Sequence, residues 1–130
     1  MSQIQPNPFL NAVRAAGTQL ANPQHHDILK VLQDFCDAVK QFPSGNLDCW
    51  KVPGFVTNLG QEYRILVKPV SKNYEHLLIR AHVPAAGTPV MLDLYDDDLI
   101  RCNTPSDLEK NLLDFLGRPL TQNLLQDLAA

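Results

Sequence analysis

Hydrophobic and polar residues alternate along three consecutive runs in the middle of the chain. The runs cover 61–70, 76–83 and 90–96, and turn-forming residues separate them at 71–75 and 84–89. Period-two alternation predicts strands with one buried face, because successive side chains point to opposite sides of a sheet. The pattern therefore predicts a three-stranded antiparallel meander.

The register of the meander follows if every apolar residue is to reach the same face. The predicted neighbours are Val67–Ile79, Ile65–Ala81 and Tyr63–Val83 in the first hairpin, and Val83–Val90, Ala81–Leu92 and Ile79–Leu94 in the second. A slip by one residue would expose a whole apolar set. This register places Leu77 inside and Leu78 outside. It also predicts a cross-strand pair between Arg80 and Asp93 on the polar face, with Leu66 as the other neighbour of Arg80.

Helical periodicity flanks the strands on both sides. Asn7-Pro8 and Asn22-Pro23 are helix starts, and Thr104-Pro105 opens a third helix that stops at Gly117. The second helix carries a well-formed apolar stripe of Ile28, Leu32, Phe35, Val39 and Phe42. A short final helix follows, with Leu120, Leu124, Leu125 and Leu128. The predicted class is α+β, a three-stranded antiparallel meander packed on one face by helices in the order α-α-β-β-β-α-α.

The irregular stretch 43–60 contains two aromatic residues, Trp50 and Phe55. Leu47 to Val52 is a candidate for a short extra strand. Two interpretations of the rings stay open. In the first and more ordinary interpretation, both rings fold back to cap the core. In the second, they lie on a protruding recognition loop, since Trp is enriched at binding hot spots.

Length and composition predict one domain over 1–130, with 1–6 as a flexible N-terminal tail. No apolar run approaches the roughly 20 residues that span a bilayer, and no leader pattern opens the chain. Cys36, Cys49 and Cys102 are odd in number and widely spaced, which is typical of free thiols in a reducing compartment. We therefore expect a cytoplasmic protein without a membrane partner.

Candidate chemistry is sparse, so the sequence favours a protein that is not an enzyme. His25-His26 are adjacent on a helix, do not face each other, and are expected on the surface. The acidic run Asp96-Asp97-Asp98 lacks the alternating ligands of a calcium loop. Cys102 lies just before a helix start, where a cysteine can have a lowered pKa, so it is the one thiol that stands out as a candidate, although no catalytic residue is expected. No metal and no cofactor are expected.

The helix, strand, strand, strand, helix order over 23–116 resembles that of double-stranded-RNA-binding domains in topology alone. Those domains present lysines at the start of the last helix, where this chain reads Thr104-Pro105-Ser106-Asp107. Residues 93–114 hold seven acidic and two basic side chains, a net charge of −5. Because phosphate contacts dominate affinity, the sequence predicts no nucleic-acid partner.

Two functional hypotheses remain. The first is a small protein-interaction module of the adaptor, chaperone-like or inhibitor/immunity type, whose partner is another protein, a basic one in particular. Its candidate contact residues are Trp50, Phe55, Asp93, Asp96, Asp97 and Asp98. The alternative is an enzyme or binder of small anionic ligands that uses Arg64, Lys68, Arg80 and His82 on the polar sheet face. A homodimer is also consistent with the sequence, through the C-terminal leucines or the edge of the first strand.

Overall fold

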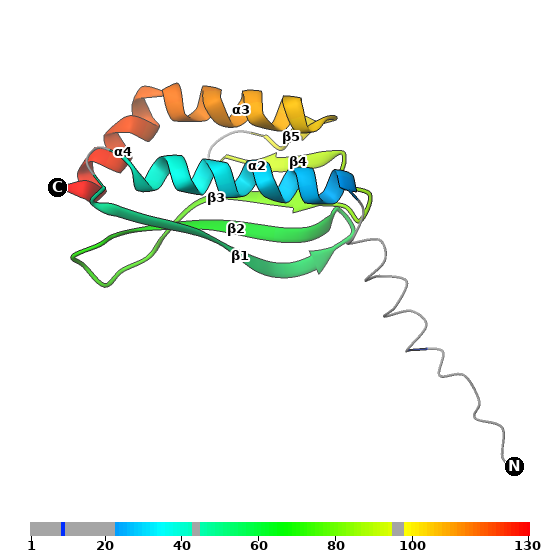
Figure 1. The fold of residues 1–130 in the computed structure, drawn as a ribbon, viewed down its shortest axis with the longest axis horizontal. Coiled ribbons are helices and arrows are strands. Elements are labelled where there is room, and N and C mark those ends of the chain that lie inside the picture. The colour runs from blue at the N-terminus through cyan, green and yellow to red at the C-terminus, as the bar shows by residue number, and fades with distance from the viewer. Residues whose placement is uncertain (1–8, 10–22, 43–44, 95–97) are drawn as a thin grey trace, which may run out of the picture.

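The computed structural model describes residues 9, 23–42, 45–94 and 98–130 (Figure 1). The first described helix is α2 (Pro23–Lys40). Five strands follow, namely β1 (Leu47–Thr57), β2 (Gly60–Pro69), β3 (His76–Val83), β4 (Val90–Asp93) and β5 (Ile100–Cys102). Helices α3 (Pro105–Gly117) and α4 (Pro119–Ala129) complete the described part. This is the predicted α+β class.

The sheet is an antiparallel meander of five strands in the order β1-β2-β3-β4-β5. The predicted three strands correspond to β2, β3 and β4, so the strand count was wrong. The candidate strand at Leu47–Val52 continues through Pro53 and Gly54 to Thr57. Proline is tolerated there because β1 is an edge strand, where a missing N–H costs no ladder bond. Strand β5 has three residues, too few for an alternation signal.

The second hairpin has the predicted register, since Ala81 lies opposite Leu92 and Arg80 opposite Asp93. The first hairpin is shifted by two residues, with Ile65 opposite Ile79 rather than Ala81. An even shift keeps every side chain on its face, so alternation alone cannot detect it. As a result Arg64, not Leu66, lies opposite Arg80.

A bulge in β3 reverses the prediction for two leucines. Ile65 pairs with Ile79 and Leu66 with Leu77, which leaves Leu78 as the extra residue. A bulge directs two consecutive side chains to similar sides of the sheet. Leu78 is therefore fully buried beside Ile79, while Leu77 turns to the opposite face and is half-buried.

The described helices all lie on one side of the sheet, which gives two layers (Figure 1). The core between the layers combines the apolar stripe of α2, the inward faces of the strands and the buried faces of α3 and α4. Its helical members include Ile28, Leu32, Phe35 and Val39, as the stripe predicted, and Phe35 meets Phe115 at 6.4 Å between ring centroids. The other sheet face is not covered by any described helix. We call it the open face.

The third helix starts as predicted. Thr104 caps α3 by accepting a hydrogen bond from the backbone N–H of Asp107 at 3.0 Å, and Pro105 occupies the first turn. In α4, Leu125 and Leu128 are buried against the domain, while Leu120 is 73% exposed. Because the domain itself buries these two leucines, α4 offers less apolar surface to a second copy of the chain than the sequence suggested.

Several predictions fall outside the described residues. They are the first helix from Asn7-Pro8, the tail at 1–6, and the placement of Asp96 and Asp97. Phe9, the one described residue before Pro23, is exposed. In the described part of the chain, no helix has the length and apolar character needed to cross a bilayer.

Candidate functional site

The open face consists of three cross-strand rows, which the strand register defines. An apolar row contains Trp50, Leu66 and Leu77; a charged row contains Val52, Arg64, Arg80 and Asp93; and a mixed row contains Glu62, His82, Met91 and Arg101. Directly opposite side chains on one face are near enough to interact. The rows therefore form one continuous surface, with an aromatic end on β1 and a charged centre.

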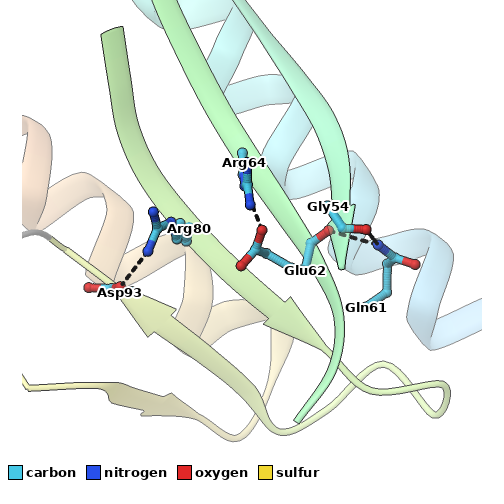
Figure 2. A network of polar contacts seen from close by, with 6 residues as sticks. All are labelled: Gly54, Gln61, Glu62, Arg64, Arg80 and Asp93. Carbon is cyan, nitrogen blue, oxygen red and sulfur yellow. Dashed lines mark hydrogen bonds and ion pairs between the residues drawn. The ribbon is translucent and has the colours of Figure 1, made fainter. Parts of the chain in front are cut away.

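The charged centre is built around a buried carboxylate. Glu62 is 7% exposed and accepts a hydrogen bond from Arg64 Nε at 2.6 Å (Figure 2). The carboxylate fits because Gly54 lies against it, and a Cβ at that position would collide with the Glu62 carboxylate oxygen. Gln61 Nε2 donates to the carbonyl oxygens of Gly54 and Glu62, both at 2.9 Å. These contacts connect Gly54 near the end of β1 to Gln61 and Glu62 at the start of β2.

Sequence reasoning missed Glu62, because a lone glutamate on a strand is normally a solvated residue. One signal was present. Glu62 and Arg64 are two residues apart on a strand, so they share a face and carry opposite charges.

Phe55 is held in place by Arg64 although its ring is 73% exposed. The guanidinium carbon of Arg64 lies 5.6 Å from the centre of the ring, within the range of a cation–π contact. The same arginine therefore pairs with the Glu62 carboxylate and contacts an exposed aromatic ring. The interpretation that Phe55 caps the core is wrong.

Trp50 also lies outside the core. Cys49 is fully buried, and Lys51 donates from Nζ to Gln33 of α2 at 3.1 Å, so both side chains face the helices. Trp50 stands between them in the strand and therefore points to the open face, where it is half-buried opposite Leu66. Both aromatic residues belong to a strand rather than to the predicted recognition loop.

The predicted pair of Arg80 and Asp93 is confirmed, with 4.0 Å between Arg80 Nη1 and Asp93 Oδ2 (Figure 2). Both side chains are about one third or more exposed, so the pair contributes about 0–1 kcal/mol. Arg64 and Arg80 lie opposite each other, and like charges in this position repel. Glu62 and Asp93 offset that repulsion.

The four residues predicted to hold an anion are only partly gathered. Arg64, Arg80 and His82 share adjacent rows, whereas Lys68 lies opposite Asp48 beyond the apolar row. Among the described residues, Arg80 Nε and His82 Nδ1 are buried without a hydrogen-bond partner.

The acidic residues predicted for interaction separate as well. Asp93 belongs to the charged row and Asp98 is exposed before β5. Of the other acidic side chains of 93–114, Asp107, Glu109 and Asp114 lie on α3, while Asp96 and Asp97 fall outside the described residues.

The free edge of β1 is protected against pairing with another strand. The backbone N–H of Cys49 donates to the Asp48 carboxylate at 2.9 Å, and Pro53 has no N–H to offer. Side chains of this kind are the usual means of blocking edge-to-edge association. The predicted edge, 61–70, is itself covered by β1.

Of the reactive groups suggested by the sequence, Cys102 and His25 are buried, whereas His26 is exposed as predicted. Burial and, to a smaller extent, the nearby Asp107 carboxylate raise the pKa of the Cys102 thiol to about 11, which is opposite to the lowering that a helix N-terminus can produce. A hydrogen bond with Cys36 and burial raise the pKa of Cys49 as well. His25 is 1% exposed, and its Nδ1 lies 3.2 Å from the Pro84 carbonyl oxygen. The predicted surface location of His25 is therefore wrong.

The described residues hold no group of three or more side chains placed to bind a metal ion. Comparison with protein-family models, curated proteins and solved structures finds no match to this chain. The function is therefore argued from the geometry of the open face.

Proposed function

We propose that this protein is a cytoplasmic protein-interaction module that docks a partner protein on the open face. The observation that carries the proposal concerns the sheet face that no described helix covers: Trp50 lies on it, and the exposed ring of Phe55 contacts Arg64 of the same face. Tryptophan and arginine are enriched among the residues that dominate binding energy. An adaptor, a chaperone-like protein and an inhibitor or immunity-type protein all act in this way.

The charged row supports a protein partner more than a free anion. Arg64 and Arg80 each have a carboxylate partner, Glu62 and Asp93, so the centre of the face is close to neutral. An interface needs such a mixed surface, in which an apolar area meets polar groups that fix orientation. The aromatic end would supply affinity and the ion pairs would supply register.

A small anionic ligand remains the second candidate, and one observation favours it. Arg80 Nε and His82 Nδ1 are neighbouring polar groups that lack partners among the described residues, and an anion could satisfy them. A ligand that binds the folded state raises the melting temperature. A rise with a nucleotide, sugar phosphate or carboxylate that is lost in Arg80→Ala would support this function.

Replacing Phe55 with serine is expected to abolish partner capture while the protein remains folded. Because the ring is 73% exposed, its loss should change the free energy of unfolding by no more than about 0.5 kcal/mol. Because the ring is proposed to be an exposed aromatic anchor, its loss should weaken partner binding by about 10-fold or more. The measurement is quantitative mass spectrometry of proteins retained by tagged variants in extracts of the native host.

The matched control is Val70→Ser, which replaces a side chain that is 61% exposed in the turn directly after β2. A stoichiometric partner should be retained by the wild-type protein and by Val70→Ser, and lost by Phe55→Ser. Equal retention by all three proteins, or no stoichiometric partner at all, would contradict the proposal.

A further inference from the structure

A groove lies on the opposite side of the molecule, between α2 and α3. Its volume is about 370 Å³, and its apolar lining consists of Val31, Phe35, Ala38, Leu112, Leu113 and Leu116. A hollow of about 140 Å³ shares Ala38 and Leu116 with it and continues towards Phe42 and Leu125 on α4. Because the two hollows share these lining residues they are adjacent, and together we call them the helical groove.

The helical groove has the length of a short helix. It follows α2 from Val31 to Val39, about 12 Å at the helical rise per residue, or just over two turns, and continues to Phe42 beyond the end of the helix. Leu113 on its wall is 64% exposed although it is a large apolar side chain. Grooves of this length between helices accept an amphipathic helix, whose side chains at positions i, i+3 or i+4 and i+7 enter the groove.

The charge around the groove is negative. On its rim Lys30 and Asp34 form an ion pair at 2.9 Å, and Glu109 lies among the lining residues from α3. Residues 23–40 and 105–130, which form the helical layer, carry seven acidic and four basic side chains, a net charge of −3. A second copy would bring another acidic layer against this one, so charge complementarity favours a basic occupant.

We infer that the helical groove binds a basic amphipathic helix of a partner protein, independently of the open face. The apolar stripe of that helix would cover Val31, Leu113 and Leu116, and its basic side chains would lie over the acidic rim. The site adds a second contact surface to the proposed interaction module and predicts the chemistry of what binds there.

The probe is a labelled peptide of roughly 14 residues with leucine at helical spacing and lysine elsewhere, long enough as a helix to cover the whole groove. Fluorescence anisotropy measures its affinity for the full protein at two salt concentrations. Binding should weaken at higher salt, because exposed charges are screened. A scrambled peptide of the same composition, and one with glutamate in place of lysine, should bind at least 10-fold more weakly.

Two exposed leucines supply a matched pair of variants. Leu113→Asp places a charge inside the helical groove, whereas Leu120→Asp places one on a leucine of α4 that is 73% exposed and does not line it. The first should weaken peptide binding at least 10-fold and the second should not. Phe55→Ser should leave peptide binding unchanged, which separates this site from the open face.

Three results would overturn the inference. They are no binding of the leucine–lysine peptide, equal binding of the scrambled peptide, and undiminished binding to Leu113→Asp. Sedimentation velocity adds a fourth, because a wild-type dimer that becomes a monomer in Leu113→Asp would assign the groove to a second copy of the chain.

Discussion

Replacing Leu78 with alanine is expected to lower the free energy of unfolding by about 2–5 kcal/mol, whereas Leu77→Ala should cost about 1 kcal/mol or less. Leu78 is fully buried because the bulge in β3 directs it into the core beside Ile79. Leu77 lies on the open face and is half-buried. The two substitutions remove the same atoms from neighbouring positions, so the difference between them reports the bulge.

Urea unfolding of both variants measures the effect. The midpoint should fall strongly for Leu78→Ala with an unchanged denaturant dependence, which marks a change in stability alone. An unbroken alternation would produce the opposite ranking, with Leu77→Ala the more destabilising. That ranking would show that β3 has no bulge and would place Leu78 on the open face.

Replacing Gly60 with alanine is expected to destabilise the protein by about 2–4 kcal/mol, because strained backbone costs about 1–3 kcal/mol by itself and a collision adds to it. The φ angle of Gly60 is +119°, which side-chain-bearing residues rarely adopt. A Cβ there would collide with the backbone of Val83 and Pro84. Gly60 thus allows the start of β2 to approach the end of β3.

Alanine substitutions at two other glycines, measured by thermal unfolding, separate the cost of backbone strain from the cost of the collision. Gly45 has a φ of +80°, but no atom lies within 4 Å of the position that a Cβ would take, so Gly45→Ala should show the strain alone. Gly117 has neither feature, so Gly117→Ala should be neutral or stabilising, since alanine favours the helix. A Gly60→Ala variant as stable as Gly117→Ala would exclude the close approach of β2 and β3.

Sequence patterns predicted the elements whose signals are local. Thr104-Pro105 marked the start of α3 through capping, and the stripe from Ile28 to Val39 marked the buried side of α2. The pair of Arg80 and Asp93 followed from a hairpin register that proved correct. In these cases the signal lies in residues close together in the sequence, either as a helix-capping residue or as the periodic spacing of apolar residues.

The missed features depend on contacts between distant segments. A bulge at Leu78 leaves no trace when residues 77–79 are all apolar. Pro53 and Gly54 are residues that normally interrupt a strand, yet β1 continues through both. The proline is tolerated because β1 is an edge strand, and the glycine makes room for Glu62. The burial of His25 arises from its contact with the turn at Pro84, 59 residues away. Neither composition nor periodicity encodes such contacts.

Oxidative footprinting of the captured complex tests the central claim most directly, because it reports which side chains the partner covers. Hydroxyl radicals modify exposed aromatic and sulfur-containing side chains, and the open face presents Trp50, Phe55 and Met91. Our account predicts that the partner protects these three side chains and leaves Tyr74, in the loop between β2 and β3, as reactive as in the free protein. Unchanged oxidation of Trp50 and Phe55 in the complex would contradict it.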